Sequence, residues 1–192
     1  MIKTKLPIYL ASRSPRRRKL LKQLGINFKS FSVNSIENLE DGEHPIRCVK
    51  RIALEKMELA KQKVDDSIII TADTIVVLNK KIIGKPTSKT DAIKILTLLS
   101  GKVHTVYTGF CVLNQKRKKL IKDYESTEVE FRSLKKDEIV DYVSGGSPMD
   151  KAGAYGIQDD FGAVFVKRIN GCYYNVVGLP ITKLYNTLRK VT

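Results

Sequence analysis

Hydroxyl and cationic side chains gather where a predicted strand runs into a predicted helix. They are Ser12, Ser14 and the arginine run from Arg16 to Arg18. Ser14 can cap the helix, and Pro15 suits its first position. Arginines in a first helical turn meet the partial positive charge of the helix N-terminus, and each costs roughly a few tenths of a kcal/mol unless an anion lies among them. Exposed arginines tolerate that penalty, but the strand–turn–helix context favours a bound phosphate.

An acidic residue, Asp73, interrupts the apolar and β-branched run from Ser67 to Leu78. A carboxylate inside such a run loses its water, which is costly unless a cation or hydrogen-bond donors compensate. Charged groups inside apolar elements gather at active sites, so Asp73 is a candidate metal ligand or general base. The alternative is an Asp at a bulge or strand break that bonds backbone groups beside Thr74.

Two lysines are candidates for contacts with phosphate. Lys56 falls on the apolar stripe of a predicted amphipathic helix, together with Ile52 and Ala60. A single lysine in that position commonly snorkels to solvent, and the alternative is an ammonium directed into a polar pocket. Lys85, within a Gly-Lys-Pro segment, follows the predicted hairpin after Asp73 and is placed to join it. The segment is not a Walker A loop, because the upstream glycine spacing and the following Ser or Thr are missing.

A loop with four glycines runs from Gly145 to Gln158. Such a backbone can approach a ligand closely. Tyr155 offers a flat ring, and the amide of Gln158 can both donate and accept, so both suit the recognition of a base. Taken alone, the pattern predicts only a loop with turn chemistry.

The elements that must position these residues alternate between strand and helix. Strands are predicted over residues 6–11, 28–33, 67–78, 82–83, 103–113, 120–131, 163–169 and 173–177. Helices are predicted over 15–24, 45–61, 88–99, 135–143 and from 180 onward. Strands and helices interleave and at least two hairpins are present, so the predicted class is α/β, with a mixed twisted sheet and flanking helices.

Length and composition bound the class of protein. The 192 residues predict a single domain over 1–192, and 42% hydrophobic with 29% charged residues is typical of a globular chain. Cys48, Cys111 and Cys172 form no C-x-x-C pair and are expected to be reduced core thiols. With only His44 and His104, no zinc cluster is predicted. No apolar run approaches the ~18 residues of a membrane span, so we expect a cytoplasmic protein without membrane contact.

The charge balance implies an anionic partner. There are 35 Lys and Arg against 20 Asp and Glu, a formal net charge of +15. Nucleic acid, membrane surfaces and phosphorylated small molecules all fit this charge, and solubility explains the basic run at 116–119 equally well. A nucleic-acid-binding module is the rival hypothesis, and it predicts a basic stripe interleaved with exposed aromatics. With no Trp and 7% aromatic residues, that stripe is not visible, and no nucleic-acid partner is expected.

Taken in chain order, seven segments across nearly the whole chain resemble the Maf proteins. They are Leu10-Ala11-Ser12, Ser14-Pro15-Arg16-Arg17, Ala72-Asp73-Thr74, Gly84-Lys85-Pro86, Leu99-Ser100-Gly101, Asp150 to Gln158, and Gly178-Leu179-Pro180. The resemblance implies a mixed α/β fold like that of inosine triphosphate pyrophosphatases, hydrolysis of nucleoside triphosphates to monophosphate and pyrophosphate, a divalent metal cation such as Mg or Mn, and a homodimer. It also implies a role in restraining septum formation during cell division. The loop from Lys151 to Gln158 is similar to the branch acting on dTTP and UTP.

The resemblance also implies roles for individual residues. Asp73 would be the central acidic residue and a metal ligand. Where the family often has two adjacent acidic residues after the second strand, this chain has Glu37-Asn38, so Glu37 is taken as the second metal ligand with Glu40 as an alternative. The residues that it implies around the nucleotide are Ser12, Arg16, Arg17, Lys56, Lys85 and Gln158, and Tyr155 is added to them because of its ring in the glycine-rich loop. Of these, Lys56, Lys85 and Gln158 are also expected to act in catalysis.

The predicted mechanism is metal-assisted attack of water on the α-phosphorus, with pyrophosphate leaving. Asp73 would hold the metal or orient the water, and the cations would stabilise charge on the triphosphate. Ser12 and Ser14 have no evident histidine partner, so a serine hydrolase is not predicted. A division regulator that acts through a protein partner remains a further alternative.

Overall fold

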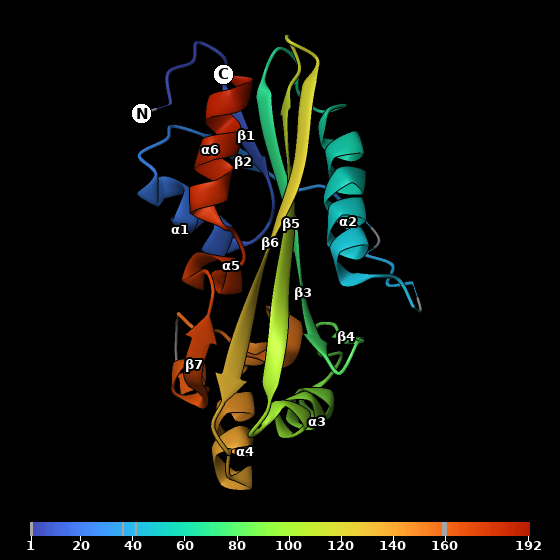
Figure 1. Ribbon diagram of the computed structural model, residues 1–192, viewed down its shortest axis with the longest axis vertical. Coiled ribbons are helices and arrows are strands. Elements are labelled where there is room, and N and C mark those ends of the chain that lie inside the picture. Colours follow the sequence, from blue (N-terminus) through green and yellow to red (C-terminus); the bar gives the residue numbers. More distant parts are fainter. Residues whose placement is uncertain (1, 36, 41, 159–160) are drawn as a thin grey trace. The chain divides into compact units, whose positions relative to one another are not determined.

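The computed structural model describes residues 2–35, 37–40, 42–158 and 161–192 (Figure 1). Its strands are β1 (Ile8–Ala11), β2 (Lys29–Phe31), β3 (Ile68–Leu78), β4 (Lys81–Ile83), β5 (Val103–Asn114), β6 (Lys119–Phe131) and β7 (Val166–Asn170). Its helices are α1 (Pro15–Gln23), α2 (Pro45–Ala60), α3 (Lys89–Leu99), α4 (Lys136–Ser144), α5 (Tyr173–Val177) and α6 (Ile181–Val191). Short 3₁₀ turns cover Ser147–Asp150, Ala152–Ala154 and Phe161–Phe165.

Within the described residues, seven strands form one mixed sheet. The order is β2-β1-β3-β5-β6-β7, with β4 paired to β3. Strand β1 is parallel to β2 and to β3, whereas β4 and β7 run antiparallel to β3 and β6. Parallel neighbours need crossover connections, and the helical segments α1 and α2 supply them. The predicted α/β class with a mixed sheet and flanking helices is confirmed.

The chain divides into two compact units. Unit 1 comprises Met1–Asp73, Thr108–Glu125 and Gly178–Thr192, and unit 2 comprises Thr74–Tyr107 and Ser126–Val177. The single domain over residues 1–192 stays a prediction, because two compact units can belong to one domain or to two.

Unit 1 places helices on both faces of its strands. Helices α1 and α6 lie on one side and α2 on the other (Figure 1). The inner stripe of α2 is fully buried at Ile52, Ala53 and Met57. At Gly109 in β5, an added Cβ would lie 2.5 Å from the carbonyl carbon of Val49, so only glycine permits this close approach of α2.

Unit 2 is built around a cluster of aromatic rings. Phe131, Phe165 and Tyr142 pack with apolar residues of α3 and α4. The strand predicted over 173–177 is wrong, because these residues form helix α5. The backbone amides of Asn175 and Val176 donate to the Cys172 carbonyl and close a helical turn there. The strand predicted over 163–169 begins only at Val166, after a 3₁₀ turn.

Two further expectations concern cysteines and membranes. Cys48 and Cys111 are buried free thiols, as predicted, whereas Cys172 is only partly buried. Among the described residues, no helix is both long enough and apolar enough to cross a membrane.

Candidate active site

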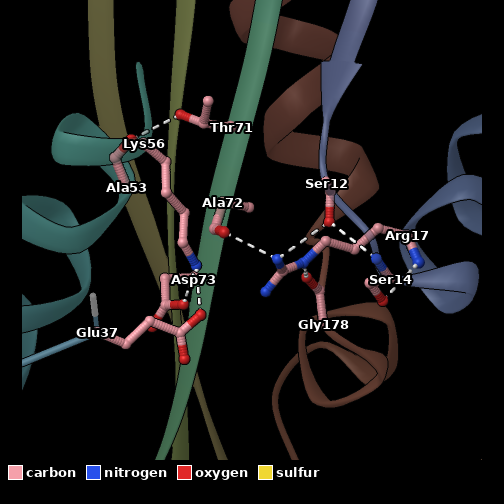
Figure 2. Close-up of polar contacts among 10 residues, drawn as sticks. All are labelled: Ser12, Ser14, Arg17, Glu37, Ala53, Lys56, Thr71, Ala72, Asp73 and Gly178. Carbon is pink, nitrogen blue, oxygen red and sulfur yellow. Dashed lines mark hydrogen bonds and ion pairs between the residues drawn. The ribbon is translucent and has the colours of Figure 1, made fainter. Parts of the chain in front are cut away.

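The centre of the candidate site is a buried lysine that binds two carboxylates (Figure 2). The Lys56 Nζ lies 2.6 Å from Asp73 Oδ1 and 2.9 Å from Glu37 Oε1. The side chains of Lys56 and Asp73 are only 9% and 7% exposed, and that of Glu37 is 37% exposed. Lys56 therefore does not snorkel to solvent. The desolvated Asp73 carboxylate has the cation that its position in an apolar strand requires.

A buried hydrogen bond sets Lys56 opposite Asp73. The hydroxyl of Thr71 donates to the carbonyl of Ala53 at 2.7 Å, and this bond ties β3 to α2 (Figure 2). Ala53 lies three residues before Lys56 on the same helix face, and Thr71 lies two residues before Asp73 on the same strand face. The contact therefore fixes the register of helix against strand at the point where the ion pair forms.

Arg17 braces the backbone beside Asp73. Its Nε donates to the Gly178 carbonyl at 2.8 Å, and its Nη1 donates to the Ala72 carbonyl at 2.8 Å and to the Ser12 hydroxyl at 3.5 Å (Figure 2). Burial lowers the pKa of Arg17, and the negative charge of Asp73 opposes that shift. One guanidinium thus connects the first turn of α1 with the residue that precedes the central carboxylate.

The hydroxyl residues at the start of α1 have structural partners. Ser14 caps the helix and accepts a hydrogen bond from the Arg17 backbone amide at 3.3 Å, as predicted. Ser12 is buried, and its hydroxyl accepts from the Ser14 amide at 3.2 Å. Arg16 lies partly exposed in the same turn, and its charge acts on Arg17. The structure therefore brings Ser12, Arg16 and Arg17 together at one helix N-terminus.

Unit 2 carries the remaining predicted residues, Lys85 and those of the glycine-rich loop. A Cβ on Gly156 would lie 2.9 Å from Lys151 Cε, so glycine makes room for the Lys151 side chain, and Gln158 Nε2 would lie 3.4 Å from the same Cβ. The Gly153 amide donates to the Gly84 carbonyl at 3.1 Å, which places the segment of the exposed Lys85 beside this loop.

Tyr155 lies in the core of unit 2 rather than where its ring would face a base. It is 5% exposed, its hydroxyl is 2.8 Å from His104 Nε2, and its ring packs edge-on against Phe131 at 4.7 Å between centroids. Burial raises the pKa of Tyr155. Gly153 and Ala154 just before it have left-handed φ values of 73° and 60°, and this turn directs the following ring inward. The placement favours a packing role over the predicted base contact.

Comparison with known proteins identifies the family. The Maf-like protein family model matches residues 7–191. The chain belongs to this family. It is 45% identical to the dTTP/UTP pyrophosphatase of Thermoanaerobacter sp. (strain X514), over 95% of each chain, and 45% identical to that of Aquifex aeolicus, over 96% of this chain and 95% of the relative. The dTTP/UTP pyrophosphatase of Syntrophomonas wolfei is 46% identical over 94% of this chain and 95% of its own. The resemblance predicted from the motifs is confirmed.

A similar solved structure is that of a HAM1 protein from Coxiella burnetii. The TM-score is 0.44 at 17% identity, over 66% of this chain and 73% of the other.

A separate cavity in unit 1 lies away from the ion-pair cluster. It has a volume of about 550 Å³ and is lined by Pro15, Arg18, Lys19, Lys22, Ile26, Asn27, Phe28 and Ser30. Neither Lys56 nor Asp73 lines it, so the cavity is not the space around the candidate carboxylates. It marks the basic outer face of α1, where part of the net positive charge collects.

Thr71 and the carbonyl of Ala72 make contacts that the sequence did not predict. Both lie inside the apolar run in which Asp73 is the conspicuous residue. A hydroxyl inside an apolar strand was the available signal for Thr71, since a buried hydroxyl must find a partner. A backbone carbonyl leaves no signal in a sequence.

Proposed function

We propose that this chain hydrolyses dTTP and UTP to the nucleoside monophosphate and pyrophosphate. Relatives about 45% identical over nearly their full length carry that activity in their names, which supports the proposal. The observation that carries the chemistry is the buried Lys56 ammonium held between the carboxylates of Asp73 and Glu37. Charged groups buried inside apolar elements, as Lys56 and Asp73 are, gather at functional sites.

Attack of water on the α-phosphorus needs an oriented water and an acceptor for its proton. Lys56 binds Asp73 Oδ1, and among the described residues the second carboxylate oxygen is left for a water or a metal ion. We assign to Asp73 the role of orienting the attacking water and accepting its proton. The brace from Arg17 to the Ala72 carbonyl holds the strand at this carboxylate, and preorganisation of that kind is what makes electrostatic catalysis effective.

A divalent cation fits the two carboxylates. Among the described residues, no group of three or more His, Cys, Asp or Glu gathers as a complete set of metal ligands. Mg²⁺ usually takes one or two carboxylates and completes its shell with water and substrate phosphate oxygens, so Asp73 and Glu37 suit a Mg or Mn ion that binds together with the substrate. Glu37 is preferred over Glu40, whose side chain is 3.7 Å from Arg51. When bound, the metal would polarise phosphate oxygens and lower the barrier to attack.

Cations and one amide are assigned to the nucleotide. Ser12, Arg16 and the N-terminus of α1 suit phosphate oxygens, because the hydroxyl, the guanidinium and the positive end of the helix dipole coincide there. Lys85 and Gln158 keep the roles that the family resemblance implies, in charge stabilisation and in recognition of the uracil or thymine edge. A cytoplasmic location, a homodimer and a part in restraining septum formation belong to the same proposal and rest on family resemblance alone.

The test is a substrate screen with product identification. Purified protein with Mg²⁺ or Mn²⁺ is incubated with UTP, dTTP, CTP, ATP, GTP and 7-methyl-GTP, and products are separated by ion-exchange chromatography. Monophosphate and pyrophosphate in equal amounts are expected from UTP and dTTP, with ATP hydrolysed poorly. Release of inorganic phosphate with a diphosphate product, or a preference for purines, would contradict the proposal.

A further inference from the structure

We infer that Arg51 is a positioning residue that holds Glu37 against Lys56. This inference rests on the proposed function, since it explains how one carboxylate of the proposed site is kept in place. Arg51 touches neither Asp73 nor Lys56 in any described contact, so its influence would pass through the chain segment that carries Glu37.

The segment that carries Glu37 has little regular structure of its own. Among the described residues between β2 and α2, no helix or strand forms. Glu37 is also the most exposed member of the cluster, at 37% of its side chain. Fixing a long side chain on an irregular segment costs conformational entropy at both backbone and side chain, so its position needs contacts from outside the segment.

Arg51 supplies those contacts from the first half of α2. Its Nε and Nη2 bind the two oxygens of Glu43 at 3.0 and 2.6 Å, a bidentate pair. The same Nη2 donates to the carbonyl of Asn38 at 2.9 Å, and Asn38 is the residue next to Glu37. The planar guanidinium holds these acceptors in one fixed geometry, which a lysine ammonium does not reproduce. The segment is thus held on α2 at two points that follow Glu37.

The clamp formed by Arg51, Glu43 and the Asn38 carbonyl is partly buried, and its two charges stabilise each other. The side chains of Arg51 and Glu43 are 25% and 11% exposed. The hydrogen bond from Arg51 holds the pKa of the Glu43 carboxyl below its usual range, and hydrogen bonds to Glu43 raise the pKa of Arg51. An isolated surface pair contributes little, but a bidentate pair joined to a backbone carbonyl forms a network with defined geometry.

A common helix makes the clamp relevant to the site. Arg51 and Lys56 both belong to α2, so the helix that holds the segment at Asn38 also receives the Glu37 carboxylate at Lys56. Arg51 also binds Glu55, at 2.9 Å from its Nη1, but this partner lies on α2 itself. Removal of the Glu55 charge therefore alters Arg51 without releasing the segment, which gives a matched control.

The experiment is a double-mutant cycle between Arg51→Lys and Glu37→Gln, with UTP as substrate. Arg51→Lys keeps the positive charge and loses the planar guanidinium that binds both oxygens of Glu43. We expect kcat to fall between about tenfold and a hundredfold with a smaller change in KM, because a displacement of about 1 Å in a group that acts on the substrate can lower the rate by about a hundredfold. In the Glu37→Gln background, Arg51→Lys should lower kcat by less than about twofold, because the residue through which it acts is already disabled.

A second readout does not depend on activity. Amide hydrogen exchange of peptides covering residues 37–44 should be faster in Arg51→Lys than in the wild type, while β3 exchanges unchanged. Glu43→Gln, which weakens the same clamp without touching α2's arginine, should change kcat and exchange in the same direction and serves if Arg51→Lys folds poorly. Glu55→Gln should leave both within about twofold of the wild type.

Either of two results would show that Arg51 does not hold Glu37. Additive losses in the cycle with unchanged exchange over residues 37–44 would overturn the inference, because Arg51 would then act independently of Glu37. An equal loss in Glu55→Gln and Glu43→Gln would also overturn it, since stabilisation of α2 would account for both. If the wild type does not hydrolyse UTP, the proposed function fails, but the exchange comparison still decides whether Arg51 holds the segment.

Discussion

Replacement of Lys56 by Met would remove the only ammonium that the described residues place between Asp73 and Glu37 while keeping the length of the side chain. Removing one partner of a buried ion pair typically costs about 3 to 5 kcal/mol, because the other charge stays desolvated. Glu37 is 37% exposed and can turn toward water, so the cost falls mainly on Asp73 and should lie near the lower end, about 3 kcal/mol. For a chain of this length, that corresponds to a melting temperature lower by roughly 6 to 12 °C.

A second substitution, Asp73→Asn, tests whether the loss of stability comes from the unpaired Asp73 charge. Combined with Lys56→Met it removes the uncompensated charge, so the double variant should regain most of the lost stability but remain inactive. Urea unfolding followed by circular dichroism measures the free energies, and Lys61→Met, at an exposed position at the end of the same helix, should change stability by less than about 1 kcal/mol. A Lys56→Met protein as stable as the wild type, or a double variant no more stable than Lys56→Met, would mean that the Asp73 charge does not depend on Lys56.

Other parts of the structure give three further predictions. Burial lowers the pKa of His104 to about 4, so the unfolded chain binds this proton more tightly than the folded protein does. The free energy of unfolding should therefore fall by roughly 3 kcal/mol as the pH drops from 6.5 to 4. In urea unfolding at a series of pH values, His104→Asn should make that fall smaller. Gly109→Ala should lower the free energy of unfolding by about 1 to 3 kcal/mol, as measured by thermal unfolding, because its Cβ would lie 2.5 Å from the Val49 backbone. Unchanged stability would mean that α2 can move away from β5 without cost. Gln158→Ala should narrow the preference in kcat/KM for UTP over ATP, whereas an equal loss for both would assign the amide to the phosphates.

Periodicity predicted the elements that carry the central cluster to within about a residue or two. The β-branched run gave β3, because a strand buried on both faces is apolar along its whole length. The apolar stripe gave α2, because a helix buried on one face repeats its apolar residues at helical spacing. The same pattern made Lys56 and Asp73 conspicuous, since each charge interrupts an apolar face. The short helix α5 was not predicted, because five residues do not distinguish helical from extended spacing.

Contacts made outside regular elements were not predictable in the same way. The choice between Glu37 and Glu40 depends on how an irregular segment is held, and no periodicity describes such a segment. Arg17 was expected to face phosphate, but the direction of an arginine at a helix start is decided by carbonyls from distant parts of the chain. Tyr155 turns inward because two residues before it adopt left-handed conformations, one of which is an alanine.

Hydrolysis of UTP and dTTP by the Asp73→Asn variant shows whether the buried carboxylate takes part in the reaction. Asparagine keeps the shape of the side chain and removes the charge that we assign to orienting water and holding the metal. Pyrophosphate release is measured with a coupled assay at saturating Mg²⁺, beside the wild type and Lys116→Ala on the exposed basic turn, with circular dichroism to confirm the fold. We expect loss of pyrophosphate release in a folded Asp73→Asn protein and a normal rate in Lys116→Ala. Near-normal turnover of Asp73→Asn would mean that Asp73 neither orients the water nor holds the metal.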